Sequence, residues 1–239
     1  MDRAYTAVHI EEDRRHWYFR GRLAVLLAAL ERVLPPPPCR LVELGCGTGN
    51  VLQSLGRFGE AIGVEYDAQL REHGRAAGLD IRAGALPDDL PLPDAEADAV
   101  LLLDVIEHLD DDRAALAAAR RLVRPGGVVV VTVPAYAWLW SGHDVALGHR
   151  RRYTARALRR LLADAGLRVE HLGYFNTVLF PAIAGVRLAK RWLGGGGHDL
   201  RRPAPPINDA LTRLFALERH VVPTPGLPFG TSVLAVARR

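Results

Sequence analysis

Short apolar runs alternate with helical patterns of apolar residues through most of this chain. The runs LLLD at 101–104 and VVVVTV at 128–133 lack polar alternation, which is typical of strands covered on both faces. We expect strands at 40–44, 61–65, 80–82, 97–103, 128–133, 167–172 and 231–237. We expect helices between most of them, at 51–57, 68–77, 111–123 and 155–165. Strands that alternate with helices predict an α/β fold, with a mostly parallel sheet and helices on both faces.

The length of 239 residues suits a single α/β domain with additional helices. A helix expected at 22–33 ends at four consecutive prolines, Pro35 to Pro38. Two more helical patterns, at 174–193 and 208–221, precede the last expected strand. We therefore expect an N-terminal helical cap or lid at 1–38 and a main domain at 39–239, with a helical insertion at about 177–222.

The charges of the chain are numerous but dispersed. Its 31 basic and 27 acidic residues leave a net charge of +4, and the longest basic run, 149–152, is one loop wide. Because a nucleic-acid surface needs basic residues gathered on one face, we do not expect a nucleic-acid partner. The sequence has no run of 18 apolar residues that could cross a membrane. We expect the apolar segment 177–188 to be a helix that packs on the sheet; the alternatives are that it lines a pocket for a lipid-like acceptor or touches a membrane surface.

Cys39 and Cys46 flank the first expected strand. Extended chain of this length separates them by about 23 Å, which is beyond the reach of a disulfide. The N-terminus has no apolar signal core. These features predict a cytoplasmic protein. The sequence does not show which oligomeric state the protein adopts.

A glycine-rich loop, VELGCGTGN at 42–50, lies where the first strand ends and the first helix begins. Glycines there allow positive φ angles and let a ligand lie against the backbone. The glycines alternate at 45, 47 and 49, whereas a dinucleotide fingerprint requires a third glycine at position 50. Glu43 would repel a pyrophosphate but would attract an ammonium group. Glu65, at the end of the second strand, can accept both hydroxyl groups of a ribose.

The chain resembles the class I S-adenosylmethionine-dependent methyltransferases. The resemblance is carried by VELGCGTGN at 42–50, GVEYD at 63–67, LLLDVIEHLDD at 101–111 and LVRPGGVVVVTVP at 122–134. It implies a Rossmann-like, seven-stranded, mostly parallel sheet and S-adenosylmethionine as the cofactor. It further implies that the loop holds the methionine portion, Glu65 the ribose, and Ala85 and Leu86 the adenine. The full set of expected cofactor-binding residues is Tyr18, Arg22, Glu43, Gly45, Cys46, Gly47, Gly49, Asn50, Glu65, Tyr66, Ala85, Leu86, Asp104 and Val105.

The segment DVIEH at 104–108 follows the fourth strand and allows three interpretations. The favoured one is contact with the cofactor or a structural role, in which Glu107 and His108 cap the helix expected near Asp110. His108 could instead be a general base for the acceptor. The pattern also resembles quinone O-methyltransferases, in which a related set of two acids and a histidine carries a metal. We expect no metal ligand on this basis.

The segment 134–153, after the fifth strand, is rich in aromatic and titratable residues and is too long for a simple turn. Such loops at the carboxyl end of a sheet usually form the substrate side of a site. We expect catalytic roles for His143, Asp144 and His149, with His108 as a fourth candidate. Trp140, Arg152 and Tyr153 are the expected acceptor-binding residues. The alternative is that Arg152 and Tyr153 only open the helix that Thr154 caps.

The motif HWYF at 16–19 is expected to fold over the same site as a lid, or to be ordinary packing of the first helix. Together with SGHD at 141–144 and HRRRY at 149–153, it resembles bacterial methyltransferases of glycan, lipid-linked and secondary-metabolite pathways. We therefore expect methyl transfer to an oxygen or nitrogen of a small-molecule, glycan or lipid-linked acceptor. The alternatives are a metal-assisted, quinone-type O-methyltransferase and a non-catalytic binding protein. No Asp/Asn-Pro-Pro-aromatic motif and no Pro-Cys pair follows the fourth strand, which disfavours DNA adenine and cytosine methylation.

Overall fold

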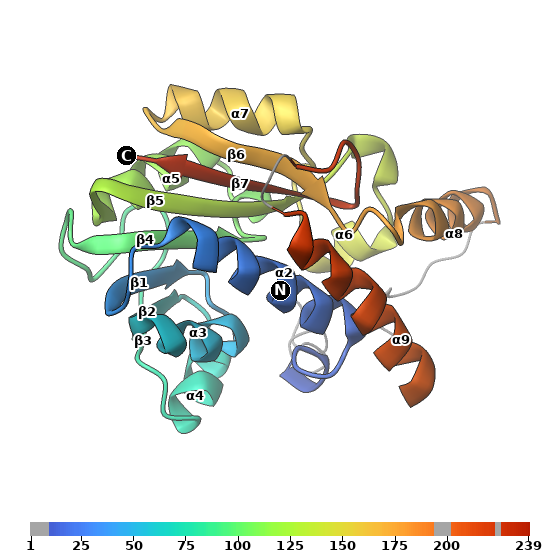
Figure 1. Cartoon of the computed structure of the whole chain (residues 1–239), viewed down its shortest axis with the longest axis horizontal. Helices are drawn as coiled ribbons and strands as arrows, with labels where there is room; N and C mark the ends of the chain where they lie inside the picture. Colours follow the sequence, from blue (N-terminus) through green and yellow to red (C-terminus); the bar gives the residue numbers. More distant parts are fainter. Residues whose placement is uncertain (1–9, 194–201, 223–225) are drawn as a thin grey trace.

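A single twisted sheet of seven strands forms the centre of the computed structural model, which describes residues 10–193, 202–222 and 226–239 (Figure 1). The strands are β1 (Cys39–Leu44), β2 (Gly59–Glu65), β3 (Ile81–Ala83), β4 (Ala97–Leu103), β5 (Val123–Pro134), β6 (Arg168–Phe175) and β7 (Ser232–Arg238). Their order in space is β3-β2-β1-β4-β5-β7-β6. β7 alone among them runs antiparallel to its neighbours, β5 and β6. The predicted Rossmann-like, seven-stranded, mostly parallel sheet is therefore confirmed.

Helices cover both faces of the sheet, as expected. α5 (Asp112–Leu122) and α7 (Ala155–Asp164) bury leucines and alanines on one face. α2 (Trp17–Val33), α3 (Asn50–Leu55) and α9 (Pro205–Ala216) contribute to the core on the opposite face. α4 (Ala68–Ala76) contacts β2 and β3. The central strands are buried on both sides, which explains why their sequences are continuous apolar runs.

The order of the strands places a ligand crevice near the middle of the sheet. From β1 the chain moves outward to β2 and β3, and then returns to place β4 on the other side of β1. The connections after β1 and β4 therefore diverge at the carboxyl ends of these strands. In open α/β sheets, ligands bind at this topological switch point.

Two expected helices differ from the observed ones. The helix expected at 174–193 is α8 (Phe180–Leu193), because Tyr174 and Phe175 continue β6 and pair with β7. The helix expected at 22–33 is α2, which begins at Trp17 instead of residue 22. The side chain of His16 caps it by accepting a hydrogen bond from the backbone N–H of Tyr18. Local periodicity could not show either boundary, because strand pairing and capping decide them.

The segment 134–153 folds into short elements that the sequence did not predict. A turn of 3₁₀ helix, η3 (Ala137–Leu139), is followed by α6 (Gly142–Leu147). Ser141 and Asp144 form a capping box at the start of α6. This arrangement places His143 and His149 at opposite ends of one short helix.

The N-terminal and C-terminal helical segments pack against each other over one face of the sheet (Figure 1). α2 lies along α9, where Gly21 lets the ring of Phe215 approach its backbone closely. The carboxylate of Glu218, just after α9, accepts hydrogen bonds from three consecutive backbone N–H groups at 176–178. These contacts join α9 to the turn between β6 and α8. In the described part of the chain, no helix has the length and apolar character needed to cross a membrane.

Candidate functional site

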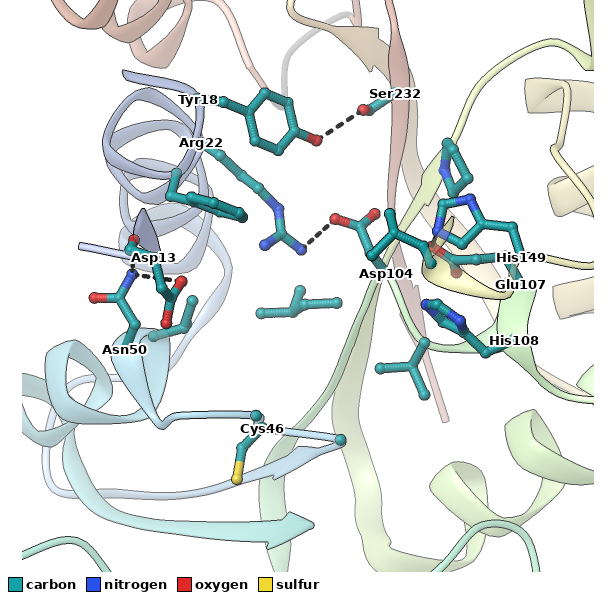
Figure 2. Close-up of a pocket in the computed structure, with 18 of the residues that line it drawn as sticks. Asp13, Tyr18, Arg22, Cys46, Asn50, Asp104, Glu107, His108, His149 and Ser232 are labelled. Atoms are coloured by element: carbon teal, nitrogen blue, oxygen red, sulfur yellow. Dashed lines mark hydrogen bonds and ion pairs between the residues drawn. The ribbon is translucent and has the colours of Figure 1, made fainter. Parts of the chain in front are cut away.

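A cavity of about 910 Å³ opens at the carboxyl ends of β1, β2 and β4. Its volume lies at the upper end of the range that is typical of ligand sites. Residues from the glycine-rich loop, from α2 and from the segment 134–153 all line it. Figure 2 shows the loop with Cys46 below, α2 with Tyr18 and Arg22 on one side, and Glu107, His108 and His149 on the other. The topology thus brings together residues that lie far apart in the sequence.

The glycine-rich loop turns tightly because Gly45, Gly47 and Gly49 all have positive φ angles. A Cβ on Gly45 would lie 2.8 Å from Cγ2 of Val105, so the loop has no room for a side chain there. The Cys46 side chain points down into the core, where burial raises the pKa of its thiol. Cys46 therefore shapes the loop and is not a nucleophile. Both Cys39 and Cys46 are free thiols.

Glu65 stands beside the loop and holds it in place. One carboxylate oxygen accepts a hydrogen bond from the backbone N–H of Gly47 at 2.8 Å, and the other accepts one from Asp67 at 2.9 Å. Burial raises the pKa of Glu65, although these two hydrogen bonds oppose that shift. Each oxygen can accept a further hydrogen bond, and Glu65 is part of the cavity lining. A ribose with adjacent hydroxyl groups matches this arrangement.

Arg22 supplies the main positive charge at the centre of the cavity. Its Nη2 lies 2.7 Å from Oδ2 of Asp104 and 3.0 Å from Oγ1 of Thr132 (Figure 2). Asp104 directly follows β4 and has a φ of 57°, a strained conformation that is concentrated at functional sites. Tyr18, one turn before Arg22, shares a hydrogen bond of 3.3 Å with Ser232 of β7. Helix α2 is thereby tied to both β4 and β7 above the ligand crevice.

Glu43 and Glu107 are buried acids that face this central charge. Burial raises the pKa of Glu43 to about 8, despite the nearby Arg22. Burial and the charge of Asp104 raise the pKa of Glu107 well above its usual range. One oxygen of Glu43 and both oxygens of Glu107 have no hydrogen-bond partner among the described residues. Buried acids without partners are costly, so these groups are suited to interaction with a bound molecule.

Asp13 is a lining residue that the sequence analysis missed. Its carboxylate accepts hydrogen bonds from the hydroxyl of Thr48 and, at 3.2 Å, from the amide of Asn50. His16 is buried next to it, and burial lowers the pKa of His16 to about 4. The segment before α2 therefore closes over the glycine-rich loop. Only the charged character of this segment was visible in the sequence, because the contacts span 35 residues or more.

The expected catalytic residues form an ordered cluster on the opposite wall. His149 Nδ1 lies 2.8 Å from Oδ1 of Asp144, and Arg152 donates two hydrogen bonds to the same carboxylate, at 2.7 and 3.0 Å. Burial alone would raise the pKa of Asp144, but the hydrogen bonds from His149 and Arg152 hold it well below its usual range. Because Asp144 is ionised, it favours the tautomer of His149 with hydrogen on Nδ1.

The remaining nitrogen of His149 faces two further groups of the cluster. His149 Nε2 lies 4.0 Å from Oε1 of Glu107, longer than a hydrogen bond, and the rings of His149 and His108 are 4.7 Å apart. Burial, assisted by the proximity of His149, lowers the pKa of His108 to about 4, so this ring is neutral. Glu107, His108 and His149 each offer a ligand atom, and these atoms lie within 4.8 Å of one another. The cluster can therefore accept a proton, and its geometry also suits a divalent cation.

Most of the predicted site residues line this one cavity. They are Tyr18, Arg22, Glu43, Gly45, Cys46, Gly47, Asn50, Glu65, Tyr66, Ala85, Leu86, Asp104, Val105, His108, His143, His149 and Arg152. Four predicted residues lie outside its lining: Gly49, Trp140, Asp144 and Tyr153.

The four outlying residues have other structural positions. Gly49 begins α3 in the left-handed conformation, and Trp140 follows η3. Asp144 stands behind His149 and cannot itself reach an acceptor. The hydroxyl of Tyr153 donates to Asp112 at 2.8 Å, away from the cavity, so the expectation that Tyr153 binds the acceptor does not match its position.

The expected capping role of Glu107 and His108 is wrong. Helix α5 begins at Asp112, and Asp111 caps it by accepting a hydrogen bond from the backbone N–H of Ala114 at 2.9 Å. Glu107 and His108 belong to a separate turn of 3₁₀ helix, η2 (Ile106–His108), at the cavity wall. Their side chains are therefore available to a bound molecule.

Comparison with known proteins explains this combination of loop, acid and sheet. A family model described as a methyltransferase domain matches residues 14–172. The chain belongs to this family. The match covers both the glycine-rich loop and α2, and the family uses S-adenosylmethionine, which is therefore the cofactor of this chain.

Individual relatives agree with the family assignment. A protein of Mycolicibacterium smegmatis named "probable S-adenosylmethionine-dependent methyltransferase" is 39% identical over 171 residues, which are 68% of this chain and 62% of that protein. A ubiquinone biosynthesis O-methyltransferase of Methylococcus capsulatus is 35% identical over 100 residues, 38% of this chain and 41% of that enzyme. The chain thus spans less than two thirds of the length of either relative.

A solved structure shows the same fold. It comes from the complex between the Haloferax volcanii Trm112 methyltransferase activator and a methyltransferase. The TM-score is 0.64 at 22% identity, and the match covers 98% of this chain and 94% of that one. This methyltransferase fold therefore extends across nearly the entire chain.

The residues of the cavity fit S-adenosylmethionine. The glycine-rich loop leaves space against its backbone, Glu65 can accept the ribose hydroxyls, and the unpartnered oxygen of Glu43 can accept an ammonium group. The exposed ring of Tyr66 and the side chain of Leu86 border the same end of the cavity. These two residues can flank the adenine.

Proposed function

We propose that this methyltransferase moves the methyl group of S-adenosylmethionine to an oxygen or nitrogen of a small-molecule, glycan or lipid-linked acceptor. The observation that supports this proposal is the shared cavity. The glycine-rich loop and Glu65 line one end of it, whereas His143 and His149 line another part of the same space. A donor and an acceptor bound side by side could therefore meet in one enclosed site.

We propose that His149 accepts the proton of the acceptor as the methyl group is transferred. Asp144 orients the ring and stabilises its charged form, and Arg152 keeps Asp144 ionised. Nε2 then carries the lone pair that removes the proton. Asp144 is thus a positioning residue, whereas His149 is the catalytic one. Burial lowers the pKa of His108, so its neutral ring forms part of the cavity wall beside His149.

The bound cofactor supplies an electrophilic methyl group on a sulfonium centre. The protein contributes alignment and exclusion of water. Tyr18, Arg22 and the buried segment around Asp13 and His16 close one side of the cavity as a lid. Asp104 holds Arg22 in place, and its negative charge offsets the positive charge of the guanidinium. This pairing reduces the repulsion between Arg22 and a positively charged sulfonium.

The binding of S-adenosylhomocysteine, measured by calorimetry, tests the cofactor part of the proposal. We expect the wild-type protein to bind S-adenosylhomocysteine and not to bind NAD. Glu65→Ala should weaken binding by about 100-fold or more, because two hydrogen bonds to a charged group are lost. Glu60→Ala is the matched control, since Glu60 is an exposed acid at the other end of β2.

Thermal unfolding of both variants would separate loss of binding from loss of fold. Glu65→Gln provides a second test, because it retains the shape of the side chain but lacks its charge. If folded wild-type protein failed to bind S-adenosylhomocysteine, the methyltransferase proposal would be wrong and a binding role would replace it.

A metal-assisted O-methyltransferase is the second candidate. It is supported by the cluster of Glu107, His108 and His149, and by similarity to a ubiquinone biosynthesis O-methyltransferase. A cation there would polarise the acceptor hydroxyl and would compete with the proton for His149. Exhaustive dialysis against a chelator distinguishes the two. Base catalysis by His149 predicts unchanged turnover, whereas loss of turnover that Zn²⁺ or Mg²⁺ restores would support the metal.

We also propose that the reaction takes place in the cytoplasm. Both cysteines of the chain are free and buried, which is typical of proteins from reducing compartments. The acceptor would then be a cytoplasmic molecule or the exposed head of a lipid-linked one. A nucleic-acid acceptor is disfavoured, because the basic residues are dispersed and many are paired with acids.

A further inference from the structure

Helix α8 presents a regular apolar face to the cavity. Leu179, just before the helix, and Ala182, Ile183 and Val186 within it follow the pattern i, i+3, i+4, i+7, and all four line the cavity. This spacing forms one continuous stripe on a helix. Such a stripe normally packs against a sheet or another helix. Here it faces the same space as the glycine-rich loop and the histidines.

The other side of α8 already has its own packing. The ring of Phe180 lies 5.9 Å from the rings of Tyr136 and Trp138 and 5.6 Å from that of Phe229. Ala184 is buried, with an exposed fraction of 7%. These contacts fix α8 beside η3 and the turn before β7. Leu179 and Ile183 of the stripe also pack on the core, whereas Ala182 and Val186 are exposed at the cavity.

Apolar groups also form other parts of the cavity wall. Trp17 and Phe19 come from α2, and Leu211 comes from α9. Trp17 is anchored at both its backbone and its ring, because its N–H donates to Asn208 at 2.9 Å and its ring lies 6.2 Å from that of Phe215. Together with the α8 stripe, these side chains define what we call the apolar lobe: Trp17, Phe19, Ala182, Ile183, Val186 and Leu211.

The apolar lobe extends beyond the residues expected to hold the cofactor. Those residues come from α2, from β1 and the glycine-rich loop, from the end of β2, and from the chain after β2, β3 and β4, and none comes from α8 or α9. Ala182 and Val186 line the cavity and are also exposed, so the lobe opens to solvent along α8. Figure 1 shows α8 projecting from the edge of the molecule, beyond the sheet.

We propose that the acceptor is amphipathic and that the apolar lobe binds its hydrocarbon portion. This proposal rests on the proposed methyltransferase function and specifies its substrate class. The hydroxyl or amino head of the acceptor lies at His149, next to the methyl donor. Its apolar chain or ring system runs along α8 and leaves the protein between Ala182 and Val186. A small hydrophilic acceptor, such as a free sugar, would leave this lobe empty.

A homologous series of alkyl 4-hydroxybenzoates, from ethyl to octyl, tests the proposal. Each ester has a phenolic head and a tail of defined length, and each is used below its micellar concentration. Calorimetry is done on the full chain saturated with S-adenosylhomocysteine. We expect affinity to rise by about fourfold for each added methylene, because each one is removed from water, until the lobe is full.

Matched variants on α8 assign the effect to the lobe. Ala182→Trp fills it and should abolish the gain from longer tails. Ala189→Trp adds the same ring to an exposed position of the same helix outside the cavity lining, and should behave as wild type. Ile183→Ala enlarges the lobe and should shift the strongest binding to longer tails.

The outcomes separate this inference from the proposed function. Affinity that does not depend on tail length, or equal effects of the two tryptophan variants, would overturn the apolar lobe. S-adenosylhomocysteine binding by each variant shows that its cofactor site is folded. If wild-type protein binds S-adenosylhomocysteine but none of the esters, only the amphipathic acceptor is wrong. If it binds neither, the proposed function itself fails.

Discussion

At the scale of single residues, the carboxyl groups of the cavity wall and of the layer behind it have opposite pKa shifts. Asp144 accepts hydrogen bonds from His149 and Arg152, and its pKa lies well below its usual range. Glu43 and Glu107 are also buried, but they have few hydrogen-bond partners to offset the cost of burying a charge. Burial therefore raises their pKa values. Opposite shifts in one site are typical of a division of roles between acids and bases. Asp144 thus serves as a permanent negative charge, whereas Glu43 and Glu107 can respond to a ligand.

The raised pKa of Glu43 predicts that stability depends on pH. Its pKa rises from an ordinary value of 4.5 to about 8 on folding, so the folded state retains a proton that the unfolded state releases. Glu43 therefore lowers the free energy of unfolding as pH rises between these values, by about 1.4 kcal/mol per pH unit. Denaturant unfolding from pH 5 to pH 8 measures the free energy of unfolding as a function of pH. The curve for Glu43→Gln should be flatter than that of the wild-type protein by about this slope.

Comparison with a surface acid makes the assignment to Glu43 specific. Glu60→Gln, an exposed residue of β2, should retain the slope of the wild-type protein. Other buried acids, such as Glu107 and Glu218, also have raised pKa values, so the difference between curves is the quantity to measure. Parallel curves for wild type and Glu43→Gln would contradict the prediction.

The pairing of Asp144 with His149 predicts a fixed tautomer. In wild-type protein, ¹⁵N–¹H NMR should find the hydrogen of the neutral His149 ring on Nδ1, where Asp144 accepts it. Asp144→Ala removes the acceptor, so both tautomers should appear and methyl transfer should fall by about 100-fold or more. His171, on β6 and remote from the cluster, is the internal reference. An unchanged His149 spectrum would show that Asp144 does not orient the ring.

At the scale of helices and strands, the α2–α9 pair depends on one close approach. A Cβ on Gly21 would lie 2.5 Å from Cδ1 of Phe215, whose side chain is fully buried. Gly21→Ala should therefore destabilise the protein by about 1–3 kcal/mol, even though alanine favours helix formation. Denaturant unfolding measures this change.

A second helical glycine provides the control. A Cβ on Gly185, in α8, would meet no atom within 4 Å. Gly185→Ala should therefore stabilise the protein by about 0.5–1 kcal/mol, since only the conformational entropy of the unfolded chain changes. The prediction for Gly21 would be refuted if both variants became more stable.

At the scale of the whole molecule, segments from the two halves of the chain close one end of the sheet. Asp13 bonds to Thr48 and Asn50, Arg22 bonds to Asp104, and Tyr18 bonds to Ser232. This part of the cavity wall is thus built from residues before β1 but is held by the first loop, by Asp104 after β4 and by the last strand. Helices α8 and α9 complete the enclosure from the C-terminal side. The division into a cap at 1–38 and an insertion at about 177–222 stays a prediction about domains, and these contacts show how closely the segments are joined to the sheet.

Local sequence patterns predicted the seven-stranded sheet, which the structure confirms, and they also predicted that the glycine-rich loop and Glu65 lie close together. Apolar runs define strands locally, and the loop at 45–49 and Glu65 both follow neighbouring parallel strands, whose carboxyl ends must meet. Local capping signals were less informative. Residue types alone suggested that Glu107 and His108 cap a helix, whereas the structure places them in the 3₁₀ turn η2. The interpretation of Tyr153 failed for a similar reason, because its partner Asp112 lies 41 residues away.

The arrangement of the residues around His149 depends on tertiary contacts that local sequence patterns did not predict. His149 and Asp144 are close in sequence, but their orientation toward Glu107 depends on the fold of the segment after β5. Leu179 and Ile183 of α8 pack on the core while Ala182 and Val186 stay exposed at the cavity, and the periodicity of the sequence does not distinguish the two situations. The contacts of Asp13 and Arg22 join positions 35 to 110 residues apart. Such long-range contacts depend on chain topology and side-chain packing, which local sequence patterns do not encode.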